Sequence, residues 1–192
     1  MKKIKIFILV FVILLITEIY SPLRRHIITS RNFKKAKLLS KEKNKKLIVI
    51  GDPCTGNVNM WFQKLFPNCK HGNVTIDLFG CNACDKMDIN NIKEWKKYNS
   101  NEYVITETGT LSFGKDMKNI LSEIKRISGG DFFSSGGTTS IVWKYVGNKL
   151  YSKKYPVGLH NIIYSFDSSK DKYYKYYNFN YKKNIKINWK NL

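Results

Sequence analysis

The sequence is poor in acidic residues, cysteine and proline, and each scarcity narrows the class of protein. Only 14 of the 192 residues are Asp or Glu, against 34 Lys or Arg, so the formal net charge is +20. A charge of this size and sign indicates an anionic partner. Four cysteines are too few for a small fold held together by disulfides. Because 43% of the residues are hydrophobic, most of the chain is expected to fold.

Several catalytic motifs are missing as well. The sequence has no phosphate-binding loop ending in Gly-Lys-Ser/Thr, no His-Glu-x-x-His and no Gly-x-Ser-x-Gly. These absences argue against a P-loop nucleotide hydrolase, a zinc protease of that type and an α/β-hydrolase. The histidines, His26, His71 and His160, lie far apart without an evident nucleophile, so no catalytic triad is predicted.

The positive charge is concentrated in the two ends of the chain. Residues 1–46 carry 13 basic and 2 acidic side chains, and residues 152–192 carry 9 and 2. Residues 47–151 between them carry 12 and 10. A nearly neutral middle argues against a basic core that reads DNA, so we expect no specific nucleic-acid binding.

The amino terminus contains an uncharged run of 12 residues, 6–17, bounded by Lys5 and Glu18. A run this short also suits a secretory signal peptide. However, no small residues at the spacing of a cleavage site follow it, and the side chains of Lys5 and Glu18 can reach the headgroups. A helix over residues 4–20 would be about 25 Å long. We predict an uncleaved transmembrane signal anchor over 4–20, with a cleaved signal peptide and a buried core helix as alternatives.

The charges on the two sides of this run predict its orientation. Three lysines precede it, and more basic residues, beginning with Arg24 and Arg25, follow it. The side richer in Lys and Arg stays cytoplasmic, so we expect the folded domain in the cytosol with reduced thiols. Residues 21–46 are interpreted as a basic linker, either lying on anionic lipid or solvated without a partner.

The rest of the sequence alternates between strand and helix patterns. Strands are expected over residues 47–50, 73–78, 102–106 and 131–133, and helices over 57–66, 89–98 and 113–127. Ser112 is the expected cap of the last helix, and Gly129 and Gly130 end it. Residues 140–146 and 149–155 bracket Gly147 and Asn148 as a hairpin. This order predicts an α/β fold: a Rossmann-like, mostly parallel sheet with a C-terminal β-hairpin, preceded by the transmembrane helix.

We assign the domain to residues 47–155 and treat 156–192 as a Lys/Tyr/Asn-rich C-terminal extension. Lys and Tyr alternate over 172–183, a pattern that can stack on bases or lie at a lipid interface. A solvated tail is the interpretation we favour, although 185–189 has the pattern of a last strand.

The first strand ends in the turn Gly51-Asp52-Pro53-Cys54-Thr55-Gly56. Ligands of open α/β sheets bind beyond the carboxyl ends of the strands, where glycine lets the backbone approach them. Asp77 falls near the end of the second strand, where a carboxylate can accept both hydroxyls of a ribose. The turn and Asp77 together predict a nucleoside pocket. The alternative is that the glycines only make the turn and Asp77 bonds locally.

Three stretches carry a family resemblance: residues 49–56, residues 75–81, and the run from Thr108 to Gly130 with its Glu-Ile-Lys-Arg-Ile-Ser-Gly-Gly ending. Over roughly 47–155 the chain resembles a shortened class I S-adenosylmethionine-dependent methyltransferase, and more closely the small methyltransferase-like proteins of large DNA viruses. The resemblance implies that Gly51, Asp52 and Gly56 lie against S-adenosylmethionine and that Asp77 holds its ribose. Pro53 and Cys54 depart from the glycine-rich turn of that family. After the third strand Glu107 is the candidate base, without an evident partner.

Cys81 and Cys84 form a single Cys-x-x-Cys, with Cys69 upstream. Two thiolates at this spacing can bind one zinc ion, and Cys69 would add a ligand. A redox dithiol and ordinary reduced cysteines are the alternatives.

We therefore expect a membrane-anchored, methyltransferase-like protein with an unidentified methyl acceptor and doubtful catalysis. A non-catalytic scaffold tethered to the membrane is the second hypothesis. A type II membrane glycosyltransferase is the third, although Asp85 and Asp88 are one residue too far apart for its Asp-x-Asp motif.

Overall fold

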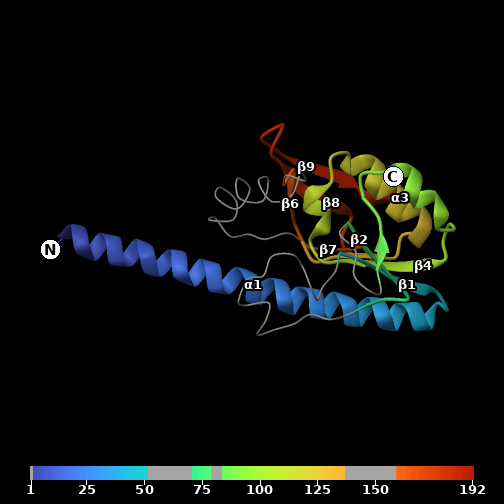
Figure 1. Cartoon of the computed structure of the whole chain (residues 1–192), viewed down its shortest axis with the longest axis horizontal. Coiled ribbons are helices and arrows are strands. Elements are labelled where there is room, and N and C mark those ends of the chain that lie inside the picture. The colour runs from blue at the N-terminus through green and yellow to red at the C-terminus, as the bar shows by residue number, and fades with distance from the viewer. Residues whose placement is uncertain (1, 52–70, 79–83, 137–158) are drawn as a thin grey trace.

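The computed structural model describes residues 2–51, 71–78, 84–136 and 159–192 (Figure 1). The elements in chain order are α1 (Lys2–Glu42), β1 (Lys46–Ile50), β2 (Val74–Asp77), β3 (Asp85–Lys86), η1 (Ile92–Lys97), β4 (Tyr103–Glu107), η2 (Thr110–Phe113), α3 (Met117–Ser128), β5 (Phe132–Ser134), β6 (Asn161–Ile163), β7 (Phe166–Asp167), β8 (Tyr173–Asn178), β9 (Lys183–Asn188) and η4 (Trp189–Asn191). Helix 57–66 and hairpin 140–155, both expected from the sequence, lie outside the described residues.

The helix α1 is continuous over 41 residues, so most of the expected basic linker is helical. Its buried residues, Thr29, Asn32, Ala36 and Ser40, recur at helical spacing and form one stripe. This stripe packs on the sheet, while the lysines of the same turns stay at the surface. The linker interpretation was wrong because it considered the charged face and missed the small residues that alternate with it. The amino-terminal half of α1 extends away from the domain (Figure 1).

Within the part of the chain that the structure describes, no helix combines the length and the apolar character needed to cross a membrane.

Six strands form one sheet in the order β3-β2-β1-β4-β5-β7. Neighbouring strands are parallel except β5 and β7, which are antiparallel. The first five strands have the order of a doubly wound fold. The predicted α/β class with a mostly parallel sheet is confirmed.

Strand residues alternate between the two faces of this sheet. Leu47, Val49, Val104 and Phe133 face α1. Residues of the opposite parity, such as Ile48 and Ile105, face the larger cluster that contains α3. Both faces of the central strands are therefore covered, as expected for parallel strands with continuous apolar runs.

The helix α3 buries the stripe predicted from the sequence, including Ile120, Leu121 and Ile124. Its cap is Asp116, whose carboxylate accepts the N–H of Asn119 at 3.2 Å. The expected cap Ser112 instead lies in η2, because the chain makes a 3₁₀ turn there before α3 begins. Gly129 ends the helix with φ +63°, as predicted. The helix expected over 89–98 is the shorter 3₁₀ element η1.

The C-terminal extension is part of the fold, so the solvated-tail interpretation was wrong. β6, β8 and β9 form an antiparallel sheet in that order, and β9 contains the last strand expected near 185–189. Tyr174 is completely buried, and its ring stacks on Phe132 with centroids 6.1 Å apart. Trp189 also stacks on Phe132, at 5.5 Å. The Lys/Tyr alternation is that of a half-buried strand, with alternate side chains directed into the core.

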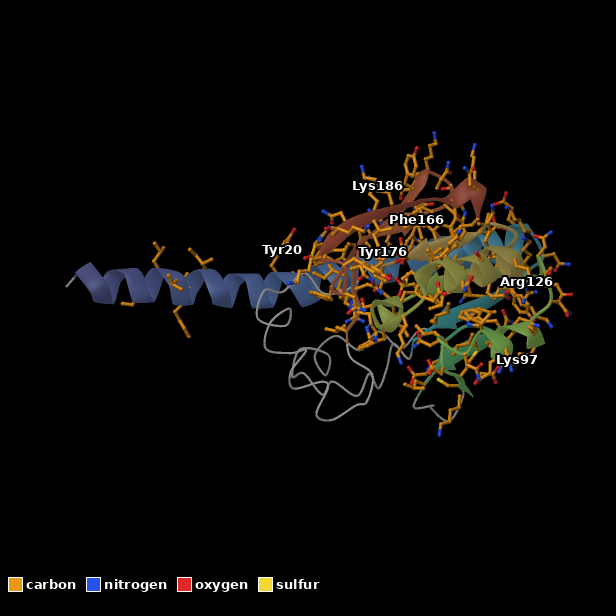
Figure 2. The ribbon with its side chains drawn as sticks, turned by 90° about the horizontal axis from the view of Figure 1, so that it is seen from above. Tyr20, Lys97, Arg126, Phe166, Tyr176 and Lys186 are labelled. Atoms are coloured by element: carbon orange, nitrogen blue, oxygen red, sulfur yellow. The ribbon has the colours of Figure 1, made fainter. Side chains whose placement is uncertain are left out.

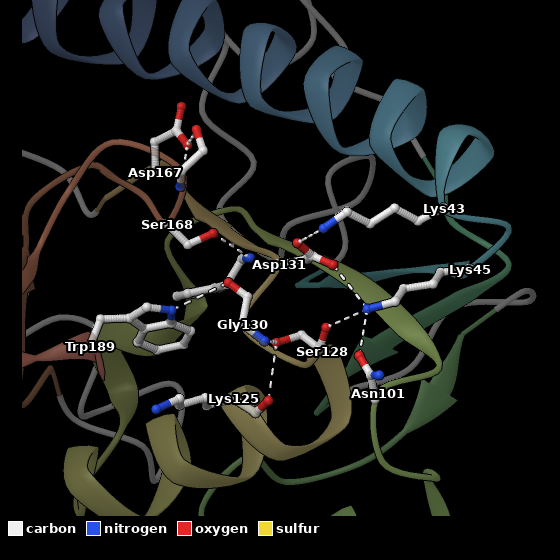
Figure 3. Close-up of polar contacts among 12 residues, drawn as sticks. Lys43, Lys45, Asn101, Lys125, Ser128, Gly130, Asp131, Asp167, Ser168 and Trp189 are labelled. Carbon is white, nitrogen blue, oxygen red and sulfur yellow. Dashed lines mark hydrogen bonds and ion pairs between the residues drawn. The ribbon is translucent and has the colours of Figure 1, made fainter. Parts of the chain in front are cut away.

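Polar contacts hold the amino edge of the sheet, where the parallel strands begin (Figure 3). Lys43 and Lys45 both pair with Asp131, at 2.6 and 2.9 Å. The Lys45 ammonium also donates to the Asn101 amide oxygen and to the Ser128 carbonyl. The end of α1 is thereby connected to the turn that precedes β5.

Replacing Tyr174 with Ala should lower the free energy of unfolding by about 3 to 5 kcal/mol, because it empties the space of a fully buried aromatic ring. Tyr173→Ala is the matched control. Tyr173 is the preceding residue, its side chain is exposed, and the loss should stay within about 0.5 kcal/mol. Urea unfolding of both variants measures the difference. Equal small losses would contradict the packing of β8 in the core.

Candidate functional site at the carboxyl edge of the sheet

The parallel strands end together at one side of the sheet, here called the carboxyl edge. β1 lies between β2 and β4. The chain passes from β1 to β2 and β3 on one side and then crosses back to β4 on the other. This reversal makes the gap between β1 and β4 the topological switch point, which is where ligands of open α/β sheets bind.

Gly51 follows β1 at this point with φ +91°, a conformation that disfavours residues other than glycine. Its N–H donates to the Ile76 carbonyl at 2.7 Å. A Cβ at Gly51 would lie 2.0 Å from the Thr110 hydroxyl and 2.5 Å from that of Thr108. The glycine is therefore required by contacts within the chain itself, whether or not a ligand approaches it.

Asp77 is the last residue of β2 and lies beside Gly51, since Ile50 and Ile76 are register partners. Its backbone carbonyl accepts the N–H of Met87 at 3.0 Å. The structure thus brings together two of the residues predicted for cofactor binding. The other two, Asp52 and Gly56, lie outside the described residues. A ligand role for the group stays a prediction.

Glu107, at the end of β4, is completely buried and its carboxylate is fully engaged. One oxygen accepts the N–H of Gly109 at 2.5 Å. The other accepts the Ser134 hydroxyl and, at 3.4 Å, the N–H of Gly136. These partners are not evident from the sequence, because Ser134 and Gly136 come from the neighbouring strand β5 and its exit. With these donors around it, the carboxylate fixes the segments that leave β4 and β5, and it is poorly placed to act as a base.

Arg25 of α1 reaches the same edge. Its Nε donates to the Thr108 carbonyl at 3.1 Å, and its Nη2 contacts the same oxygen. A Cβ on Gly109 would lie 3.0 Å from that Nη2, so Gly109 lets the guanidinium approach the backbone. Nothing in the sequence predicts this contact, because 83 residues separate its partners. It brings a permanent positive charge to the switch point.

Two buried hydroxyls at this edge, those of Ser112 and Ser135, have no hydrogen-bond partner among the described residues. Buried polar groups are nearly always bonded in folded proteins, so these two hydroxyls are exceptions at this edge.

His160 also lies here, with its backbone N–H donating to the Ser112 carbonyl at 3.0 Å. Burial lowers the pKa of His160, and the nearby Lys115 lowers it further. The imidazole is therefore neutral at pH 7 and able to accept a hydrogen bond or a proton.

The predicted cysteine site is only partly visible. Cys84 is disulfide-bonded, whereas zinc coordination requires a thiolate. Cys69 and Cys81 lie outside the described residues, and a zinc role for them stays a prediction. Across the described ranges, no three His, Cys, Asp or Glu side chains gather closely enough to hold a metal ion.

Replacing Glu107 with Gln should lower the free energy of unfolding by about 1 to 3 kcal/mol, because the new amide group would face an N–H or O–H donor and leave it unpaired. Glu102→Gln is the matched control: Glu102 is exposed just before β4, and its change should stay within about 0.5 kcal/mol. Denaturant unfolding compares the two variants. Equal stabilities would show that the Glu107 hydrogen bonds do not hold this edge together.

Comparison of the chain with protein-family models, with curated proteins and with solved structures gave no match.

Proposed function

We propose that this protein is a single-pass membrane protein whose α/β domain binds S-adenosylmethionine at the carboxyl edge of its sheet. The observation that carries the proposal is the position of Asp77 beside Gly51 at the topological switch point. The methyl acceptor is not specified by any described residue.

The membrane part of the proposal is supported by the surface of α1. Six consecutive large apolar residues, from Ile8 to Ile13, are each 41 to 60% exposed. They surround the helix on every side, in the half that extends from the domain (Figure 1). A helix that is apolar all round is stable when buried in a core or in lipid. Basic residues flank it on both sides, as in helices held at two membrane interfaces.

The carboxyl edge offers groups that match the polar parts of the cofactor. Asp77 could accept hydrogen bonds from both ribose hydroxyls. The positive charge of Arg25 suits a carboxylate, and the buried Ser112 and Ser135 hydroxyls have no hydrogen-bond partner among the described residues. When bound, S-adenosylmethionine would supply a methyl group activated by a sulfonium, so the protein would have to bind and orient the two reactants.

Two observations favour the second candidate function, a non-catalytic scaffold tethered to the membrane. The Glu107 carboxylate is occupied by donors from its own chain, and Gly51 is explained by contacts with Thr108 and Thr110. The glycosyltransferase hypothesis has less support, because Asp85 binds the Tyr98 hydroxyl at 2.8 Å and pairs with Lys97.

Titration of the full chain in detergent with S-adenosylmethionine and S-adenosylhomocysteine tests cofactor binding. We expect saturable heat, and at about 100 times the dissociation constant roughly 2.7 kcal/mol of added stability, seen as a higher melting temperature. Asp77→Ala should weaken binding at least about tenfold, equivalent to about 1.4 kcal/mol. Glu102→Ala, which removes a carboxylate at the opposite edge, should leave it unchanged. No heat and no melting shift would leave the scaffold function.

Carbonate extraction of membranes that contain the full chain tests the anchor. The wild type should stay in the pellet. Val10→Lys combined with Ile13→Lys should release most of the protein, because each lysine at the centre of a span costs about 2.5 to 3.5 kcal/mol. Leu38→Lys is the control, since Leu38 is 60% exposed on the half of α1 that packs on the sheet. Release of the wild type would refute the anchor.

The side of the membrane that holds the domain is a separate question. The distribution of Lys and Arg around residues 4–20 favours the cytosol, whereas the disulfide of Cys84 is typical of an oxidising compartment. Protease protection in sealed vesicles distinguishes the two orientations.

A further inference from the structure

The turn between β8 and β9 presents an aromatic side chain and two lysines to solvent. Tyr181 is 69% exposed, and Lys182 and Lys183 are exposed beside it. The Lys183 ammonium lies 5.7 Å from the centre of the Tyr181 ring. Among the described residues, no ion pair involves either lysine. We call residues 181–183 the hairpin tip.

The hairpin tip lies at the carboxyl-edge end of the domain. Asn178, just before the turn, is paired with Asn161 of β6. The Asn161 amide donates to the Gly114 carbonyl, which follows η2 at the exit of β4. At the other end of the hairpin, the Trp189 indole donates at 3.3 Å to Gly130, before β5 begins. The hairpin therefore runs from the amino edge to the carboxyl edge.

The helix α1 leaves the domain over the same edge. Lys43 pairs with Asp131 ahead of β5, the Asn32 amide donates to the Ser134 carbonyl at the end of β5, and Arg25 reaches Thr108 beyond β4. This order shows that α1 runs antiparallel to the strands and continues past their carboxyl ends. Figures 1 and 2 both show the turn of the hairpin at the end of the domain from which α1 emerges.

We propose that the hairpin tip is a second membrane contact, which binds anionic phospholipid headgroups. The inference depends on the proposed anchor in α1. A helix rises about 1.5 Å per residue, so Tyr20 lies about 8 Å beyond Arg25 and Ile13 about 18 Å beyond it. The turn over residues 179–182 carries the tip beyond Asn178, and the lysine side chains reach further. The tip and the residues of α1 near Tyr20 therefore lie at the same end of the domain (Figures 1 and 2).

The side chains of the tip suit this partner. A tyrosine ring has an apolar body and a polar hydroxyl, and it favours the headgroup region. Each lysine close to an anionic leaflet strengthens binding roughly fivefold. Lysine beside tyrosine can also stack on single-stranded nucleic acid. A membrane is favoured because the tip is at the end of the domain where α1 emerges.

The consequence for function is that two attachments, α1 and the hairpin tip, hold the carboxyl edge toward the bilayer. The group around Gly51 and Asp77 would then face the membrane surface, and its acceptor would be reached there.

The test uses the full chain in vesicles, with an environment-sensitive dye coupled to an unnatural azido amino acid in place of Asn180, the exposed turn residue before the tip. A headgroup-attached quencher measures contact with the surface. We expect quenching in vesicles of phosphatidylcholine with 30% phosphatidylserine, and its loss in phosphatidylcholine alone or at high salt. The double variant Lys182→Gln, Lys183→Gln should shift the ratio of docked to undocked tip roughly 25-fold.

Two controls match these changes. Lys93→Gln with Lys96→Gln removes the same charge from η1, where both lysines are exposed, and should have no effect. The dye in place of Glu102, at the amino edge, should stay unquenched in both kinds of vesicle.

Each result that would contradict the proposal can be recognised separately. Protein that floats with the vesicles while the dye at 180 stays unquenched would overturn the tip contact and leave the anchor intact. Protein that does not float with any vesicle would refute the anchor and the tip contact together. Displacement of the tip by a single-stranded oligonucleotide would identify a nucleic-acid surface in place of the lipid surface.

Discussion

The docking of α1 across the parallel sheet is the constraint on which the rest of the arrangement depends. The helix buries Thr29, Asn32, Ala36 and Ser40 and covers the apolar face formed by β1, β4 and β5. Because it is one continuous helix, the position of its packed half also fixes the direction of its exposed apolar half. A flexible linker would leave the domain free to rotate. A packed helix determines which edge of the sheet is nearest to the amino terminus, and that edge is the one where ligands of this fold class bind.

At that edge, a buried carboxylate organises the backbone. Glu107 accepts hydrogen bonds from Gly109, Ser134 and Gly136, and so connects the exit of β4 to the exit of β5. A buried carboxyl group without such partners would be destabilising, so the positions of these loops and the burial of Glu107 depend on each other. The carboxylate oxygens of Glu107 that hold these loops are the same atoms that a catalytic base would use.

The two basic ends of the sequence lie at defined places in the fold. The two basic ends of the chain are α1, together with the residues after it, and the β8–β9 hairpin. Both lie around a core of nearly balanced charge, and both reach the carboxyl edge. Their inner faces are small or aromatic and their outer faces carry lysine. The basic side chains therefore lie on the outer faces of elements whose inner faces pack in the hydrophobic core.

The sequence by itself determined the α/β class, the four parallel strands β1, β2, β4 and β5, the buried stripe of α3 and its glycine stop, because periodicity and glycine conformation act within a few residues. It also placed Gly51 and Asp77 at strand ends. It did not determine that residues 21–42 are helical and packed, or that Tyr174 and Trp189 lie in the core, since Lys-rich segments look solvated until a partner surface exists. The contacts of Glu107 with Ser134 and of Arg25 with Thr108 were decided only by the tertiary structure, because they join residues 27 and 83 positions apart, a separation at which no local pattern operates.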